Sequence, residues 1–137
     1  MTSYYLSSRY SNAKMLNHYA DMVEAALPEA IVLSTWHREA AQNVEDILTA
    51  TELTANPDVG WYCAERVLHD MDAADTLVAF TGEGGKGGRH VEYGYAIATN
   101  MRLVVVGERD NVFYCHPEVE HFDTAEDWLA NEGRRNR

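Results

Sequence analysis

The chain has 137 residues, of which 46% are apolar, so it is long enough for one folded domain and too apolar for a disordered segment. Its formal net charge of −11 disfavours nucleic acid and anionic membranes as partners, because both repel an acidic surface. No apolar run approaches the roughly 18 residues of a membrane span, and the first residues lack the layout of a signal peptide. We therefore expect a cytoplasmic protein, and a small ligand is compatible with this charge.

The N-terminal part of the chain predicts a strand, a helix and a second strand. Residues 3–7 form the first expected strand. Ser11 can cap a helix whose apolar side chains recur every three or four residues and which Pro28 helps to end. Residues 30–34 are a compact apolar run typical of a buried strand, and residues 38–49 are compatible with a helix.

The same alternation continues to the end of the chain. Asn56, Pro57 and Asp58 indicate a helix start, because a cap, a first-turn proline and an acid near the positive end of the dipole follow one another. A strand at 76–80, a glycine-rich loop, a helix at about 90–99, a strand at 103–106 and a helix capped by Thr124 and ending near Asn131 come next. Apolar strands alternating with helices predict an α/β fold with a doubly wound parallel sheet. We expect a single domain over residues 1–137, with a flexible tail at 130–137.

The glycine-rich loop is the most informative segment for function. Ligands of such sheets bind outside the carboxyl ends of the strands, where this loop is expected to meet residues 7–10 and 34–37. Five glycines between Gly82 and Gly88 permit a close approach of the backbone to a ligand, and a helix N-terminus attracts anions. Glu92 is expected in the first turn of that helix, where the dipole favours its ionised form. An ionised carboxylate in a ligand cleft can attack a sugar carbon and hold a covalent intermediate.

Residues of the first two loops have both a binding and a structural interpretation. Ser7, Ser8 and Arg9 follow a strand end, where hydroxyl groups and amides either hold an anion or form an ordinary turn. Trp36 either stacks on a base or covers the core. These interpretations stay open on the sequence alone.

The residues around the start of the expected helix also have two interpretations. Gly87 and Gly88 leave room for a ligand beside the backbone. Arg89 and His90 either contact a phosphate or a sugar hydroxyl group, or point into solvent as exposed residues of a helix start.

Two other phosphate-binding motifs overlap this loop. Gly82-x-Gly84-x-x-Gly87 formally matches the dinucleotide fingerprint, and Glu108 lies about where the ribose-binding acid is expected. However, this unit is not the first strand–helix turn of the sheet, and the chain is small for a dinucleotide enzyme. A Walker-type loop is disfavoured because Lys86 is followed by a glycine and not by serine or threonine. A dinucleotide-binding oxidoreductase is therefore the least favoured functional interpretation of this loop.

Neither the cysteines nor the histidines indicate a metal site. Cys63 and Cys115 lie far apart in apolar stretches, as buried thiols do in a reducing compartment. The six histidines show no metal-ligand spacing such as HExxH. We expect no metal and no other cofactor.

Several segments together resemble the nucleoside 2-deoxyribosyltransferase family. The resemblance rests on residues 92–96 (EYGYA) after the glycine-rich loop and on residues 74–78 (ADTLV) before it. Residues 5–11 (YLSSRYS) and 32–36 (VLSTW) are similar to the first and second strand regions of that family. The resemblance runs from about residue 4 to residue 106. It implies a flavodoxin-like fold and cleavage of the N-glycosidic bond of a nucleoside or nucleotide.

The resemblance also implies roles for individual residues. A glutamate at the position of Glu92 attacks the anomeric carbon, a tyrosine at the position of Tyr5 helps to position it, and a second base or water resolves the intermediate. The family's base-handling aspartate is replaced by Val67, and its aspartate six residues before the nucleophile by Lys86. A nucleotide-binding protein without turnover is therefore the alternative to a transferase or an N-glycosidase. Asp70 is expected nearer the far end of the sheet, as a solvated or capping acid.

Residues 111–115 (NVFYC) are apolar and aromatic and follow the last clear strand. Such a surface usually needs a cover, so we expect a homo-oligomer. The resemblance implies that a neighbouring subunit completes the pocket, with Asn111 as the candidate residue for that role.

Overall fold

The computed structural model describes residues 2–42, 55, 57–82 and 87–135. The strands within this part of the chain are β1 (Ser3–Ser7), β2 (Ile31–Val32), β3 (Thr76–Phe80), β4 (Arg102–Val106) and β5 (Glu120–Phe122). The helices are α1 (Ala13–Ala26), α2 (Trp36–Gln42), α4 (Pro57–Ala73), α5 (Gly88–Ala98) and α6 (Ala125–Arg135), with the short 3-10 helices η1 (Tyr10–Asn12) and η2 (Val112–Cys115).

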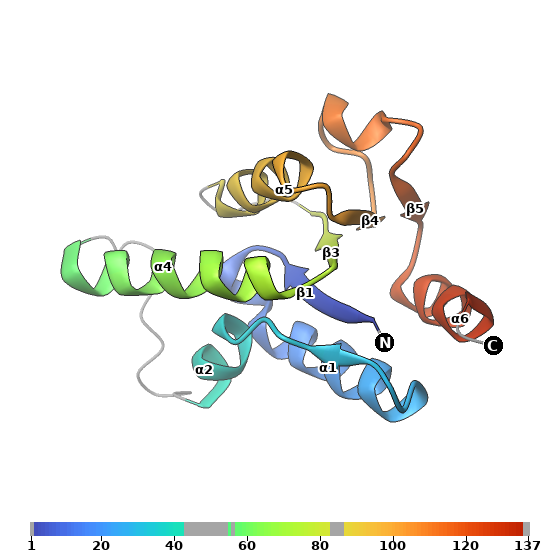
Figure 1. Cartoon of the computed structure of the whole chain (residues 1–137), viewed down its shortest axis with the longest axis horizontal. Coiled ribbons are helices and arrows are strands. Elements are labelled where there is room, and N and C mark those ends of the chain that lie inside the picture. The colour runs from blue at the N-terminus through green and yellow to red at the C-terminus, as the bar shows by residue number, and fades with distance from the viewer. Residues whose placement is uncertain (1, 43–54, 56, 83–86, 136–137) are drawn as a thin grey trace.

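The strands form one parallel sheet in the order β2-β1-β3-β4-β5. This is the strand order of a flavodoxin-like fold, so the expected doubly wound α/β architecture is confirmed. Helices α1 and α6 cover one face of the sheet, and α4 and α5 cover the other (Figure 1). No helix of the described residues is long and apolar enough to cross a membrane.

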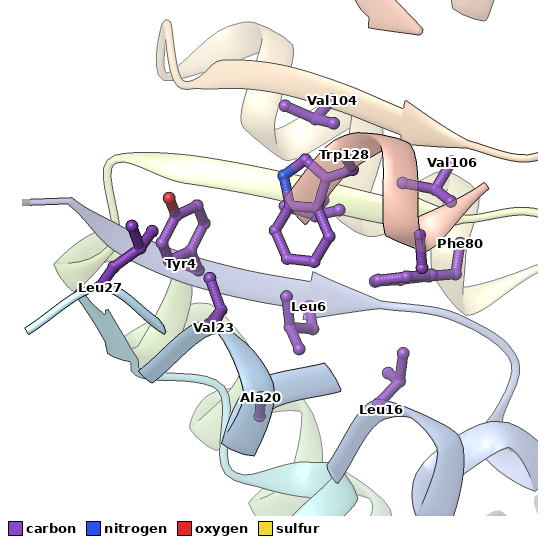
Figure 2. Packing of buried hydrophobic residues seen from close by; sticks show 12 residues of the cluster. Tyr4, Leu6, Leu16, Ala20, Val23, Leu27, Phe80, Val104, Val106 and Trp128 are labelled. Atoms are coloured by element: carbon purple, nitrogen blue, oxygen red, sulfur yellow. The ribbon is translucent and has the colours of Figure 1, made fainter. Parts of the chain in front are cut away.

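The core beneath α1 and α6 is centred on Trp128. Its indole ring packs edge-on against Tyr4, at a centroid distance of 5.8 Å, and against Phe80, at 5.9 Å (Figure 2). Leu16 and Val23 of α1 are fully buried against the same face, as their helical spacing predicts. This side of the sheet is therefore closed by apolar packing.

A charged cluster lies on this face of the sheet. Tyr4 donates a hydrogen bond to Glu132 Oε2 at 2.5 Å. Arg102 donates to both oxygens of Glu132, at 2.6 and 3.1 Å, and to both oxygens of Glu120, at 2.6 and 2.9 Å. Glu132 has no exposed surface, so this cluster joins α6 to β1, β4 and β5 from the inside.

Among the described residues, the core beneath α4 and α5 contains three buried tyrosines. Tyr5, Met71, Tyr93 and Tyr114 are buried here with the small side chain of Ala96. The rings of Tyr93 and Tyr114 meet edge-on at 4.6 Å. Tyr4 and Tyr5 thus enter different cores, because successive side chains of a strand point to opposite faces.

Two helix starts differ from those that the sequence predicts. Ser11 lies inside η1, and Asn12 takes the N-cap position of α1. Helix α5 begins at Gly88 and not near His90, which leaves no acidic residue in its first turn. Glu92 therefore lies beyond the first turn, contrary to our expectation.

Around α2 and α4 the expectations are met in part. Pro57 begins α4 and Asp58 lies in its first turn, as predicted. The expected cap, Asn56, lies outside the described residues, as does the 43–49 part of the expected helix 38–49. That helix begins earlier than expected, at Trp36.

The second strand is shorter and more exposed than predicted. Only Ile31 and Val32 of residues 30–34 are in β2, and this strand is not buried, since Ile31 is 40% exposed. The reason is topological, because β2 lies at the edge of the sheet and pairs with β1 alone.

The C-terminal part contains more structure than the sequence indicates. Strand β5, at 120–122, was not expected. Thr124 caps α6 as predicted, by accepting a hydrogen bond from the backbone of Asp127 at 3.1 Å. Helix α6 continues to Arg135, so residues 130–135 of the expected flexible tail at 130–137 are helical.

Candidate functional site

The carboxylate of Glu92 is held by two hydroxyl groups from the carboxyl half of β1. Tyr5 donates to Oε1 at 2.9 Å, and Ser7 donates to Oε2 at 3.2 Å. Tyr5 and Ser7 have no exposed surface, whereas Glu92 keeps part of its own. The three residues join the end of β1 to α5, the helix that follows the glycine-rich loop.

Burial sets the charge state of Glu92. Desolvation raises the pKa of its carboxyl to about 7, although the hydrogen bonds from Tyr5 and Ser7 act in the opposite direction. We expected the helix dipole to favour the ionised form of Glu92, and this expectation is wrong. Glu92 lies past the first turn of α5, and desolvation favours the protonated form. Close to neutral pH, this carboxyl exists both with and without its proton.

Tyr5 is a hydrogen-bond donor over the whole physiological range. Burial raises the pKa of its hydroxyl well above the usual value, and the charges of Glu92 and Asp70 raise it further. A neutral phenol can donate to a carboxylate without adding charge to the site. Tyr5 therefore orients Glu92 and does not neutralise it.

Ser8 and Arg9 take part in local contacts of the first loop. Ser8 donates to the carbonyl oxygen of Phe80 at 3.1 Å and accepts from Asn12 at 2.9 Å. Arg9 Nε donates to Asn12 Oδ1 at 3.3 Å. For Ser8, these bonds support the structural interpretation, since they join the end of β1 to the end of β3.

Trp36 lies at the edge of both cores. Its indole nitrogen donates to the carbonyl oxygen of Leu6 at 3.0 Å, and its ring is stacked on Tyr10 at 6.1 Å. Trp36 is thus fixed by contacts within the chain, and Tyr10 joins it in an aromatic pair beside the first loop. Tyr10 was not among the residues expected to bind a ligand.

The start of α5 is shaped by glycine. Gly87 is the N-cap, with a φ of 92° that lies in the left-handed region favoured by glycine, and Gly88 begins the helix with an exposed surface. Residues 83–86 of the glycine-rich loop, which include Gly84 and Lys86, lie outside the described residues. The dinucleotide fingerprint is therefore described only at its two ends.

Arg89 is not a free surface cation. It donates to both oxygens of Asp110, at 3.2 and 2.8 Å, and to the hydroxyl of Tyr114 at 3.0 Å. Only 9% of its side chain is exposed, and it lowers the pKa of Asp110. Both of our interpretations missed this pairing, which ties the start of α5 to the loop after β4.

His90 and Asn111 lie side by side across the same loop. Asn111 accepts from the backbone of Phe113 at 2.9 Å, so its amide nitrogen faces His90 Nδ1, at 3.1 Å. With Tyr93, Ile97 and Phe113, they border a cavity of about 300 Å³ between α5 and the start of η2. Helical periodicity places Glu92 on another side of α5, so these two residues do not join it in one constellation.

Asp70 is a polar residue whose position the sequence analysis misjudged. It is only 7% exposed, and its Oδ2 accepts from the backbone and the hydroxyl of Thr35, at 3.0 and 2.7 Å. Its charge acts on Tyr5, so it lies near the candidate site and is not a solvated acid. The signal was its place between Val67 and Met71, which both face the core beneath α4.

The described residues hold no group of three or more His, Cys, Asp or Glu side chains that could bind a metal ion. What the site contains is an acid with a pKa near neutrality, two neutral donors and a partly exposed position. These properties suit a nucleophile or a general base.

No protein-family model matches the chain, and no curated protein sequence does. Among solved structures, the chain is similar to BcmB, a CMP N-glycosidase from Clostridium botulinum. The TM-score is 0.58 at 12% sequence identity, and the match covers 96% of this chain and 98% of that chain. A likeness at this identity establishes the flavodoxin-like fold over nearly the whole chain and leaves the activity to the site.

Proposed function

We propose that the chain cleaves or transfers at the N-glycosidic bond of a nucleoside or nucleotide, through a covalent glycosyl intermediate on Glu92. The observation that carries this proposal is the Glu92 carboxylate, which is clamped by Tyr5 and Ser7 and partly open to solvent. The similarity to a CMP N-glycosidase supports the class of reaction. The resemblance of residues 92–96 to the deoxyribosyltransferase family points in the same direction.

The first step uses the ionised form of Glu92. A carboxylate oxygen bonds to the anomeric carbon while the bond from that carbon to the base nitrogen breaks, and its electron pair leaves with the base, which takes up a proton. Tyr5 and Ser7 hold the carboxylate in one orientation, which reduces the entropy lost on reaching the transition state. A carboxylate with a pKa near 7 is also more basic than an exposed one, and therefore a better nucleophile.

The second step frees Glu92. Water or the nitrogen of a second base bonds to the anomeric carbon as the bond to the glutamate oxygen breaks, and the incoming nucleophile loses a proton. Water gives hydrolysis and a base gives transfer, so the same residues serve an N-glycosidase and a transferase. The balance between them depends on which acceptor enters the site.

The second candidate function is binding of a nucleotide without turnover. Val67 favours it, because this apolar side chain packs against the core beneath α4 where the resembled family has an acid that handles the base. Asp70, one turn further along α4, is engaged with Thr35. A chain that cannot assist the leaving base would retain the fold and a ligand without the reaction.

A product assay separates these functions. The protein is incubated with a panel of nucleosides and their 5′-phosphates, with and without an added second base, and the products are separated by chromatography. Free base indicates hydrolysis and an exchanged base indicates transfer. A rise in melting temperature without any product would contradict the proposal and support binding alone.

Trapping tests the covalent step directly. A 2-fluoro sugar substrate with a good leaving base should leave a glycosyl mass on the peptide that contains Glu92, because the fluorine slows both steps and the good leaving base keeps the first step faster than the second. Glu92→Gln should carry no such mass. A label on another residue would move the chemistry elsewhere.

We also propose that the protein works as a homo-oligomer. Val112 and Phe113 of η2 are 78% and 64% exposed, and they lie near the cavity bordered by His90 and Asn111. Apolar side chains of this size are commonly covered by a partner. Light scattering at micromolar concentration should give a mass above that of one chain, and a monomer would contradict this proposal.

A further inference from the structure

The ladder between β1 and β2 ends before the carboxyl end of β1. Leu33 donates to the carbonyl oxygen of Tyr4 at 2.8 Å, and the next two bonds of a regular parallel ladder would join the Leu6 amide to the Leu33 carbonyl and the Thr35 amide to the Leu6 carbonyl. The Thr35 amide donates instead to Asp70 at 3.0 Å. The backbone of Leu6 therefore faces the second strand region at a point where the regular pairing has stopped.

Two side chains replace the missing backbone partners. Ser34 Oγ accepts from the amide of Leu6 at 3.1 Å, and the indole nitrogen of Trp36 donates to the carbonyl oxygen of Leu6 at 3.0 Å. Both polar groups of Leu6 are thus satisfied, as a buried backbone requires. The position of this part of β1 depends on how firmly the two side chains are held.

Ser34 is held by a buried histidine and an asparagine. The amide nitrogen of Asn17 donates to the carbonyl oxygen of His37 at 3.0 Å, so Asn17 Oδ1 must accept the proton of His37 Nδ1, at 2.6 Å. His37 Nε2 is then without a proton and accepts from the Ser34 hydroxyl at 2.7 Å. The row of hydrogen bonds from Asn17 through His37 to Ser34 therefore has a single consistent set of donors and acceptors. Since the Ser34 hydroxyl donates its hydrogen to His37, its lone pairs are left to accept from the Leu6 amide.

A serine and a histidine that is oriented by a third polar residue, usually an acid, form nucleophilic triads in hydrolases, but this arrangement does not suit that chemistry. Ser34 is 1% exposed and His37 is fully buried, so a substrate has no access to the hydroxyl. Ser34 Oγ also already accepts a backbone hydrogen bond. The row is therefore suited to holding Leu6 and not to attacking a substrate.

Leu6 is the residue between the two partners of Glu92. Tyr5 and Ser7 both point to the side of α5, and their hydroxyl groups meet different oxygens of one carboxylate. A shift of the Leu6 backbone moves both hydroxyl groups together. We propose that Asn17, His37 and Ser34 form a positioning relay that fixes Leu6 and thereby sets Tyr5 and Ser7 at hydrogen-bonding distance from Glu92; as a role in catalysis, this rests on the proposed function.

The relay is in one protonation state wherever Glu92 titrates. Burial, helped by Arg38, lowers the pKa of His37 to about 4, while Asp70 and Asp21 act weakly in the opposite direction. His37 is therefore neutral around pH 7, where the carboxyl of Glu92 changes its charge. A change in the titration of Glu92 between pH 5 and 9 thus reports its own surroundings and not protonation of His37.

The test measures the Glu92 carboxyl itself in full-length variants. Carbon-13 NMR of glutamate-labelled protein gives its titration, with Glu92→Gln used to assign the signal. Ser34→Ala removes the partner of the Leu6 amide, and His37→Leu removes the support of Ser34. Val23→Ala is the matched control, because Val23 is equally buried on α1, the helix that carries Asn17, but points into the core centred on Trp128.

We expect Ser34→Ala and His37→Leu to raise the pKa of Glu92, because longer hydrogen bonds from Tyr5 and Ser7 stabilise its ionised form less. Each half unit of increase should lower kcat/KM at pH 6 about threefold, with little change above pH 9. Val23→Ala should leave the titration and the shape of the pH profile unchanged. If His37→Leu does not fold, Ser34→Ala carries the test alone.

The outcomes separate this inference from the proposed function. A folded Ser34→Ala protein whose Glu92 titrates as in the wild type overturns the relay, whatever the enzyme does. A raised pKa in a protein that neither releases nor exchanges a base on any nucleoside or nucleotide retains the relay as a structural device and refutes the proposed function. An equal shift in Val23→Ala also overturns the relay, because any loss of packing would then have the same effect.

Discussion

Two tyrosine–glutamate pairs begin at neighbouring residues of β1 and lie on opposite faces of the sheet. Tyr5 donates to Glu92 on the side of α4 and α5, and Tyr4 donates to Glu132 on the side of α1 and α6. Both tyrosines are fully buried. The strand, the donor and the acid are alike, so the difference between the pairs comes from what surrounds each acid.

The difference is a cation. Arg102 binds both oxygens of Glu132 and lowers the pKa of Glu120 beside it. Within the described part of the chain, Glu92 accepts hydrogen bonds from the neutral hydroxyl groups of Tyr5 and Ser7, and burial raises its pKa to about 7. A buried carboxylate with an arginine is part of the scaffold, whereas one without a cation keeps a proton that it can lose near neutral pH.

The largest expected effect is on the rate. Glu92→Gln keeps the size of the side chain and removes the proposed nucleophile, so kcat should fall by about 10³-fold or more. Glu132→Gln should leave kcat within about threefold, measured where the variant is fully folded, since this residue lies across the sheet. Steady-state kinetics on one substrate measure both. Equal losses in the two variants would mean that Glu92 has no special role.

The next effect is on stability, and here the larger loss is expected for the pair that contains Glu132. Arg102→Met leaves the buried Glu132 without its cation and should lower the free energy of unfolding by about 3–5 kcal/mol. Glu92→Gln should cause no such loss. Urea denaturation at pH 7 compares them, and a stable Arg102→Met protein would show that the cluster contributes little.

Stability should also depend on pH through Glu92. The pKa of Glu92 is raised from 4.5 in the unfolded chain to about 7 in the fold, so between these values the folded chain holds a proton that the unfolded chain has lost. The free energy of unfolding therefore falls as pH rises through this window, by at most about 3 kcal/mol. Glu92→Gln should be more stable than the wild type at pH 8 and no more stable at pH 4. Denaturation at both pH values checks this, and a gain of equal size at both would contradict it.

Substitution of the two tyrosines should have different effects on the pH dependence of kcat/KM. Tyr5→Phe removes a hydrogen bond that lowers the pKa of Glu92, so the acid limb of kcat/KM should move to higher pH, with about a tenfold loss at pH 6 for each unit. Tyr4→Phe should leave the profile in place and lower stability by about 1–2 kcal/mol, since Glu132 loses a donor. Profiles from pH 5 to 9 distinguish them. A shift in Tyr4→Phe would mean that the two faces are coupled.

The smallest effect is expected for Ser7→Ala. Its hydrogen bond to Glu92 is longer than that of Tyr5, 3.2 against 2.9 Å, so the same limb should move in the same direction by less. The measurement is the pH profile used for Tyr5→Phe. A larger shift than in Tyr5→Phe would show that Ser7 and not Tyr5 is the main partner of Glu92.

The sequence predicted more of the first pair than of the second. Glu92 and Tyr5 lie in segments that a family resemblance places together, and the structure joins them by a hydrogen bond. The partners of Glu132 come from β1 and β4, and no local spacing relates residues that far apart. One signal was present, because Glu132 lies one helical turn after Trp128 and so shares its buried face.

The fold was predictable where apolar runs are long. Strands β3 and β4 are runs of apolar residues and were expected close to their observed bounds. Strand β5 has three residues, only partly buried, and no periodicity can indicate so short an edge strand. Asp70 was misplaced because it accepts hydrogen bonds from Thr35, which lies in the loop between β2 and α2 and far from Asp70 in sequence.

The alternation of Tyr4 and Tyr5 gives β1 an unusual evolutionary constraint. Conservative substitutions elsewhere in the strand leave each tyrosine on its own face, but insertion of one residue between Tyr5 and Leu6 moves Tyr5 to the opposite face. Such a change would turn Tyr5 toward the charged cluster of Arg102 and Glu132, and in the same event Glu92 would lose its phenol donor. We therefore expect descendants of this chain to vary in the composition of β1 while keeping its length.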